Sequence, residues 1–148
     1  MLDKVFVIDG SAENAEEAIK TTGSKLMEEG YVKESFINAC LEREKVFPTG
    51  LPTEIGVAIP HCDAIHVNKP AICVLRLSKP VQFQNMGGEE APVNCEYIMN
   101  LALHKQEDQV VLLSRIIKMV QDTEFLRKIK FEDKQEVEEQ ILNLLEEE

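Results

Sequence analysis

The spacing of apolar residues changes twice along this chain, and these two changes constrain the fold more than any other feature. Up to Phe47 the apolar residues recur every three or four positions, as on one face of a helix. From Thr49 to about Leu103 they gather in short runs rich in β-branched residues, which is typical of strands. From Val110 onward the helical spacing returns. The sequence therefore predicts an α/β fold in which helices flank a central β-sheet.

No sequence feature divides the chain into parts. The 148 residues contain no repeat, no low-complexity tract and no linker rich in Pro, Gly and Ser. A chain of this length with 44% hydrophobic residues can bury a core of its own. We expect residues 1–148 to form a single domain.

Capping and stop signals define two helices in the first third of the chain. Asn14 followed by Glu17 fits a capping box at the start of the first helix, and Gly30 fits its end. A second helix follows at once. It should end near Phe47, because the residue before Pro48 disfavours helical geometry.

Three short apolar runs in the middle of the chain predict strands, at Val57–Ile59, Ala71–Leu77 and Tyr97–Leu103. Gly87 and Gly88 mark the longest loop between them. The C-terminal helices are predicted from helical spacing at Val110, Leu113, Ile117 and Val120, and again at Val137, Ile141, Leu144 and Leu145.

Charge and cysteine usage exclude several classes of function. The net charge of −11 repels phosphate backbones and anionic headgroups, so we expect no nucleic-acid partner. Residues 1–10 lack the basic and apolar stretches of an export signal. The sequence also contains no run of about 18 apolar residues that could span a membrane. The four cysteines are spread singly along the sequence, and this pattern is typical of reduced thiols in a cytoplasmic protein.

The stretch Gly56–His61 presents a histidine at a stiff strand end. Ile59 precedes a proline and is pushed toward extended geometry, while Pro60 fixes its own φ and has no N–H to donate. Gly56 can take dihedrals that a side chain forbids. Because much of the catalysis available to a nucleophile comes from its position, His61 is the candidate catalytic residue.

Imidazole is well suited to carrying a phosphoryl group. It is largely neutral near pH 7, one ring nitrogen can attack phosphorus, and the other can be fixed by a hydrogen bond. Phosphoryl transfer also needs cationic donors, and Arg43 is the candidate because it falls at the edge of the apolar stripe of its predicted helix. On these residues alone, a structural or exposed His61 and an ordinary surface ion pair of Arg43 remain alternatives.

Glu44 lies nearer the centre of that apolar stripe than Arg43 does. Two interpretations are open. Either the helix ends before Glu44, or the carboxylate is partly enclosed and needs a partner, for which Arg43 or a histidine would serve.

Three segments occur in a characteristic order and spacing, namely Arg43-Glu44, Thr49-Gly50 and the stretch Gly56–His61. This set resembles the phosphoryl-carrying A component (enzyme IIA, or EIIA) of the fructose and mannitol class of the bacterial phosphoenolpyruvate:sugar phosphotransferase system (PTS). The sequence of residues 47–52, Phe-Pro-Thr-Gly-Leu-Pro, resembles that of the galactitol branch more than those of the fructose or mannitol branches.

The resemblance implies a mixed sheet flanked by helices and a relay function without a cofactor. His61 would accept phosphate on Nε2 from the histidine phosphocarrier protein (HPr), and Arg43 would stabilise that phosphate. The phosphoryl group would then pass to a cysteine of the sugar-specific IIB component. The sugar would never touch this chain, and contact with the membrane would come only through the IIC complex.

One position departs from the family pattern. Fructose and mannitol relatives carry a second active-site histidine at the start of the helix after the sheet, and the nearest register here puts Asp108 there. His104, four residues earlier, is the candidate for this second histidine, and its alternative is a histidine that merely ends a strand.

Cys62, Asp63 and His66 are metal-compatible residues close to His61, but their spacing matches no standard zinc pattern. We expect no metal site, a packed Cys62 and a surface His66.

Two other functions stay open beside the transport role. The phosphohistidine could serve a regulatory module of the nitrogen-related type, which reports energy status to a transporter or transcription factor. The second alternative is a metal-dependent hydrolase, which would require a stoichiometric metal.

Overall fold

The computed structural model describes the backbone of residues 2–104 and 106–146, and the side chains of the same residues apart from 106–108. Five strands of these residues form one sheet in the order β1-β4-β5-β3-β2. β1 is parallel to β4 and β3 to β5, whereas the β4–β5 and β2–β3 pairs are antiparallel, so the sheet is mixed. The strands are β1 Lys4–Gly10, β2 Gly50–Leu51, β3 Gly56–Ala58, β4 Ala71–Phe83 and β5 Val93–Ala102.

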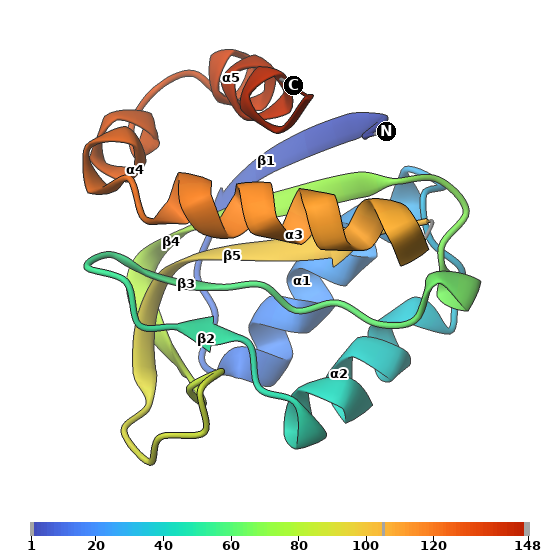
Figure 1. Cartoon of the computed structure of the whole chain (residues 1–148), viewed down its shortest axis with the longest axis horizontal. Helices are drawn as coiled ribbons and strands as arrows, with labels where there is room; N and C mark the ends of the chain where they lie inside the picture. The colour runs from blue at the N-terminus through green and yellow to red at the C-terminus, as the bar shows by residue number, and fades with distance from the viewer. Residues whose placement is uncertain (1, 105, 147–148) are drawn as a thin grey trace.

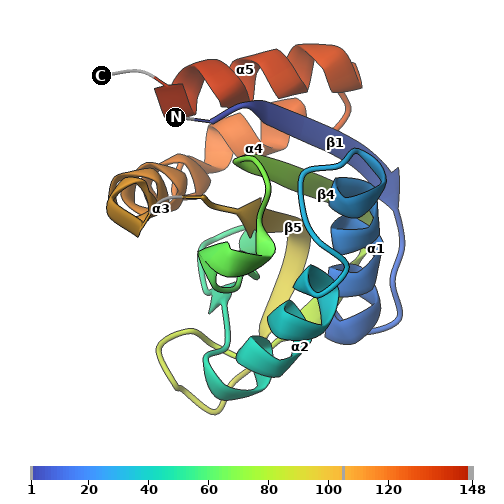
Figure 2. The same cartoon turned by 90° about the vertical axis from the view of Figure 1, so that its right-hand side faces the viewer.

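Helices cover both faces of the sheet, which confirms the predicted α/β class. α1 and α2 lie on one face, and α3, α4 and α5 lie on the other (Figures 1 and 2). Within the described residues, no helix is long and apolar enough to cross a membrane. The helices are α1 Ala15–Glu28, α2 Phe36–Val46, α3 Gln106–Val120, α4 Thr123–Ile129 and α5 Lys134–Glu146, with one 3₁₀ turn, η1, at Ala64–His66.

The core consists of two apolar clusters, one on each face of the sheet. β1 contributes to both, because successive side chains of a strand point to opposite faces. Val5 and Val7 pack with the helices of the C-terminal third, and Phe6 packs with α1 and α2.

The predicted helix ends are confirmed. The Oδ1 atom of Asn14 accepts a hydrogen bond from the backbone N–H of Glu17 at 2.9 Å at the start of α1. After α1, Gly30 has φ of +84°, a left-handed geometry that favours glycine. α2 ends at Val46, next to Phe47, as the proline that follows requires.

The prediction of helical structure up to Phe47 is wrong for β1, which pairs with β4 along its whole length. Val5, Phe6 and Val7 are all buried, because helices cover both faces of the sheet here. A short run buried on both faces shows no alternation, so its spacing cannot be distinguished from that of a buried helix.

Three other features also lay outside the prediction. β2 has only two residues, and α4 is a short helix capped by Asp122, whose Oδ1 accepts from the backbone N–H of Phe125 at 3.1 Å. β4 extends beyond the predicted Leu77 to Phe83, with an irregularity in its register against β5 between Arg76 and Val81. The register shift lets a proline-containing segment stay within one long strand.

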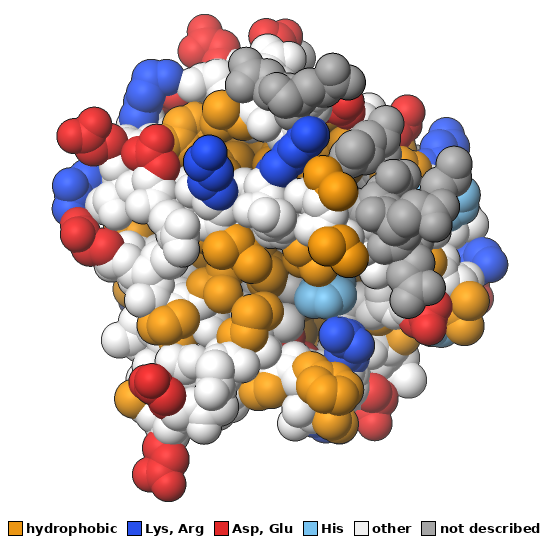
Figure 3. Space-filling model, viewed as in Figure 1, with side chains coloured by type: hydrophobic (Ala, Val, Ile, Leu, Met, Phe, Trp, Pro, Cys, Tyr) orange, Lys and Arg blue, Asp and Glu red, His pale blue; other side chains and the backbone are white. Residues whose placement is uncertain are grey.

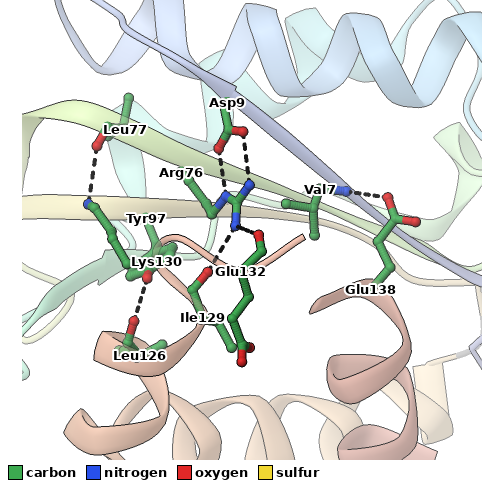
Figure 4. Close-up of polar contacts among 10 residues, drawn as sticks. All are labelled: Val7, Asp9, Arg76, Leu77, Tyr97, Leu126, Ile129, Lys130, Glu132 and Glu138. Atoms are coloured by element: carbon green, nitrogen blue, oxygen red, sulfur yellow. Dashed lines mark hydrogen bonds and ion pairs between the residues drawn. The ribbon is translucent and has the colours of Figure 1, made fainter. Parts of the chain in front are cut away.

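A cluster of polar contacts anchors the C-terminal helices to the sheet (Figure 4). Arg76 of β4 donates to both carboxylate oxygens of Asp9, at 2.6 and 2.9 Å. Its Nη1 also donates to the backbone carbonyls of Ile129 and Glu132, at 2.9 and 2.6 Å. Because those carbonyls lie at the end of α4 and in the loop after it, one side chain ties β1, β4 and the C-terminal helices together.

Candidate phosphoryl-transfer site

His61 follows β3 and lies beside the end of β5. The backbone N–H of Leu101 donates to the carbonyl of Pro60 at 2.9 Å, and His61 and Leu101 form an isolated parallel bridge. The N–H of Ile59 donates to the carbonyl of Thr49 at 3.3 Å. Hydrogen bonds to two neighbouring segments therefore hold the backbone that presents His61.

A hydrogen bond fixes the tautomer of the imidazole. The Nδ1 atom of His61 lies 2.8 Å from the carbonyl oxygen of Ile59. Because a carbonyl oxygen can only accept, Nδ1 carries the proton in this contact. In the neutral ring, Nε2 is then the nitrogen with the free electron pair, which is the nucleophilic form.

The surroundings of His61 favour this neutral form. Burial of the ring is the main cause that lowers the pKa of His61, and the positive charge of Arg43 lowers it further. The hydrogen bond to Ile59 acts in the opposite direction but does not outweigh the burial. At neutral pH the imidazole is therefore uncharged and ready to attack an electrophile.

His61 lines a cavity of about 390 Å³, within the size range of pockets that take small ligands. In the space-filling view a histidine lies near the middle of this face, next to a basic side chain and several hydrophobic ones (Figure 3). The cavity combines residues from α2, from the segment after β3 and from α3, and these residues are Arg43, His61, Cys62, Asp63, Ala64, Gln109 and Leu113.

Arg43 comes from the last turn of α2 and lines the same cavity as His61. Its guanidinium carbon lies 5.0 Å from the centre of the Phe47 ring, a cation–π arrangement. Among the described residues no carboxylate pairs with it, so the surface ion pair that the sequence left open does not form there. With respect to the described residues, the guanidinium is thus available to an anion in the cavity.

Glu44 braces the turn between α2 and β2. α2 continues past it to Val46, and the carboxylate is partly buried. Its two oxygens accept from the backbone N–H and the hydroxyl of Thr49, each at 2.8 Å. The partner is therefore Thr49 and not the expected Arg43 or histidine, since the chain turns back on the helix end. Burial raises the pKa of Glu44 despite these two bonds.

The structure does not place His104, a candidate for the second histidine position, in the cavity with His61 and Arg43. His104 is exposed, two residues beyond β5, and is not among the residues that line the cavity. The side chain of Asp108 lies outside the described residues. Gln109 and Leu113 of α3 line the cavity instead. Gln109 could not be predicted from the sequence as a residue of the site, because its place depends on how α3 packs beside the sheet.

Cys62, Asp63 and His66 have separate structural contacts. Cys62 is buried, with its Sγ 3.8 Å from the carbonyl of Phe36, and Asp63 accepts from the N–H of Ile65 at the start of η1. The Nδ1 atom of His66 lies 2.7 Å from the hydroxyl of Ser35. No group of three His, Cys, Asp or Glu side chains suited to a metal ion occurs in the part of the chain that the structure describes.

Comparisons with known proteins agree with this fold. The family model described as "Phosphoenolpyruvate-dependent sugar phosphotransferase system, EIIA 2" matches residues 2–147. The chain is 32% identical over 114 residues to the PTS system galactitol-specific EIIA component of Escherichia coli strain K12, and the aligned part covers 76% of this chain and 75% of that protein.

Two solved structures show the same arrangement of elements. A chain in the complex of enzyme IIAMTL and phosphorylated enzyme IIBMTL from Escherichia coli matches with a TM-score of 0.75 and 25% identity, covering 96% of this chain and 93% of that one. The nitrogen regulatory protein IIA-Ntr from Neisseria meningitidis matches with a TM-score of 0.66 over 96% of this chain and 92% of that one. At 19% identity the second likeness shows the fold alone.

Proposed function

This chain belongs to the EIIA 2 family of the phosphoenolpyruvate-dependent sugar phosphotransferase system, and we propose that it carries the phosphoryl group on His61. Members of this family are phosphotransferases that pass phosphoryl groups between proteins. One observation carries the proposal: a neutral imidazole whose Nδ1 is occupied by the carbonyl of Ile59 shares a cavity with Arg43. This arrangement leaves Nε2 as the acceptor.

The first transfer takes a phosphoryl group from the phosphohistidine of HPr. The electron pair of Nε2 of His61 attacks phosphorus, and the bond from phosphorus to the donor nitrogen breaks. The donor nitrogen keeps that electron pair. His61 keeps its proton on Nδ1, where the carbonyl of Ile59 stabilises the positive charge that develops on the ring.

Arg43 stabilises the transferred group. The phosphoryl oxygens carry negative charge throughout the transfer, and a guanidinium offers N–H donors in a planar fork that fits them. Arg43 lines the cavity from α2, and its stacking on Phe47 limits the positions that its long side chain can take. It acts on the phosphoryl group directly and is a catalytic residue in this proposal.

The second transfer delivers the phosphoryl group to a cysteine thiolate of a sugar-specific IIB component. The thiolate forms the bond from sulfur to phosphorus as the bond from Nε2 to phosphorus breaks, and the electron pair returns to His61. Galactitol is the proposed substrate of the system, supported by the 32% identity to galactitol-specific EIIA over three quarters of both chains. The likeness to nitrogen regulatory protein IIA-Ntr shows the fold alone and supports neither role, so the transport role rests on the identity to galactitol-specific EIIA.

We place this relay in the cytoplasm, with the membrane reached only through the IIC complex. The four cysteines are free and buried, which fits a reducing compartment. His104 remains a candidate to assist His61 from the end of β5, and its exposure leaves it accessible to a docked partner.

The test is phosphorylation with purified components. The protein is incubated with labelled phosphoenolpyruvate, enzyme I and HPr, and then with galactitol IIB or mannitol IIB. We expect an acid-labile, alkali-stable label that His61→Ala abolishes and that galactitol IIB drains faster than mannitol IIB. A label that survives His61→Ala would contradict the assignment of His61, and faster drainage by mannitol IIB would contradict galactitol.

A further inference from the structure

Gln109 brings a third polar group to the cavity of His61 and Arg43. It lines the cavity from α3 together with Leu113, and residues four apart lie on one face of a helix. Arg43 comes from α2, and His61 from the segment after β3. Three separate parts of the fold therefore place an imidazole, a guanidinium and a side-chain amide around one space.

The amide of Gln109 has a hydrogen-bond donor that no described residue engages. Its Nε2 donates to the carbonyl of Leu103 at 3.3 Å, a long hydrogen bond. A glutamine amide has two N–H donors, and this contact uses one of them. Among the described residues no acceptor engages the other. The half-buried side chain can thus hold Leu103 and still donate into the cavity.

A phosphoryl group on His61 would need such a donor. It carries close to two negative charges at neutral pH and has three oxygens that accept hydrogen bonds. Among the described residues that line the cavity, Arg43 is the one Lys or Arg, and Asp63 lines it with the opposite charge. A neutral donor from α3 adds binding to the phosphoryl oxygens without a further titrating group.

We propose that Gln109 is a phosphate-binding residue whose side-chain amide donates a hydrogen bond to the phosphoryl group on His61. The proposal rests on the phosphoryl-carrier function of His61. An amide does not titrate, so Gln109 itself adds no pH dependence to the transfer. In the competing interpretation, Gln109 only ties α3 to the end of β5 through the carbonyl of Leu103.

The experiment compares three variants of Gln109 in the full chain with HPr as the donor. Gln109→Glu keeps the size but places a carboxylate beside the phosphoryl group, so phosphorylation of His61 should slow about a hundredfold. Gln109→Ala removes the donor and should slow it about tenfold. Gln109→His restores an N–H donor, so it should recover most of the rate at neutral pH and add a second titration to the pH profile. Gln121→Glu, at an exposed position just after α3, is the control for the charge change.

The outcomes separate this proposal from the function on which it rests. If the wild-type chain accepts no label on His61, the phosphoryl-carrier proposal itself fails. If it accepts label and Gln109→Glu matches Gln121→Glu, only the role of Gln109 is overturned. Equal slowing in all three Gln109 variants, with an equal fall in melting temperature, would also overturn it, because a structural contact with Leu103 would explain that pattern. Slowing by Glu and Ala with recovery by His supports it.

Discussion

The guanidinium of Arg43 rests on the ring of Phe47, with 5.0 Å between the guanidinium carbon and the ring centre. Phe47 follows α2 directly and is 59% exposed, so the ring packs little in the core. Its contact with the arginine is of the kind that is worth about 0.5–1 kcal/mol at exposed sites. Phe47 is therefore a positioning residue for Arg43.

Replacing Phe47 should slow phosphoryl transfer without unfolding the domain. With Phe47→Ala, Arg43 loses its aromatic support, and we expect kcat/KM for acceptance from HPr to fall about two- to fivefold. Phe47→Tyr keeps an aromatic face and should retain the wild-type rate. Val46→Ala is the control, because Val46 is an exposed apolar neighbour without a ring. Equal loss in the Val46 and Phe47 variants would point to partner contact instead of arginine positioning.

The lowered pKa of His61 predicts how acceptance depends on pH. Below about pH 6.5 a free histidine is largely protonated, whereas the folded chain keeps His61 neutral down to its lower pKa. Phosphorylation by HPr should thus hold its rate from about pH 7.5 to 6.5 and fall only below that range. The free energy of unfolding should depend on pH in the same direction. The unfolded chain takes up the proton first, so stability is lost as the pH falls from about 6.5 toward the folded pKa.

Arg43 contributes to this shift through its positive charge. Arg43→Gln should raise the pKa of His61 toward its ordinary value, measured by NMR titration of the ring. Lys45→Gln is the matched control. It removes a charge from the same helix at an exposed position that pairs with Glu42. A larger change in the pKa of His61 with the lysine variant than with the arginine variant would refute the assignment.

Glu44 should matter for stability more than for chemistry. Glu44→Ala leaves the N–H and hydroxyl of Thr49 without their acceptors, and Thr49 is only 2% exposed. We expect the free energy of unfolding to fall by about 1–3 kcal/mol in denaturant titrations. Glu42→Ala, an exposed neighbour, should change it little. If both variants are equally stable, the brace between α2 and β2 has no energetic role.

Arg76 should stabilise the attachment of the C-terminal helices. Arg76→Met keeps the apolar stem but leaves the carbonyls of Ile129 and Glu132 without a donor, so the free energy of unfolding should fall by about 1–3 kcal/mol. Arg127→Met, whose pair with Glu54 is exposed, should cost less than about 1 kcal/mol. A similar loss in both variants would contradict this role for Arg76.

The contact of Arg76 with Asp9 adds a pH dependence to that prediction. The hydrogen bond from Arg76 is the main cause that lowers the pKa of Asp9. Stability from this contact is present above pH 3.8 and is lost as the pH falls through the lower pKa of the folded state. The difference in stability between wild type and Arg76→Met should therefore shrink in acid. A difference that stays constant down to pH 2 would contradict the linkage.

Local signals in the sequence were sufficient for much of the fold. Asn14, Gly30 and Pro48 act on their own neighbours, so the helix ends they indicate are confirmed. β1 could not be predicted in this way, because its assignment depends on pairing with β4, 67 residues later. The spacing of the apolar residues Val5–Val7 does not indicate that they pair with β4.

The residues of the candidate site show the same difference between local signals and long-range packing. His61 and Arg43 belong to segments whose local geometry the sequence indicates, and they line one cavity. Gln109 and the Thr49 partner of Glu44 depend on how chain segments pack after they form. Helical spacing placed Leu113 on the apolar face of a predicted helix. It could not show that Leu113 lines the cavity of His61.

The most direct test of the account is the location of the phosphate on the His61 ring. The phosphorylated protein, prepared with HPr and ¹⁵N-labelled histidine, is examined by NMR for the coupling between phosphorus and the ring nitrogens. Because Nδ1 donates to the carbonyl of Ile59, we expect phosphate on Nε2 of His61 with Nδ1 still protonated. Phosphate on Nδ1, or on His104 or His66, would contradict it.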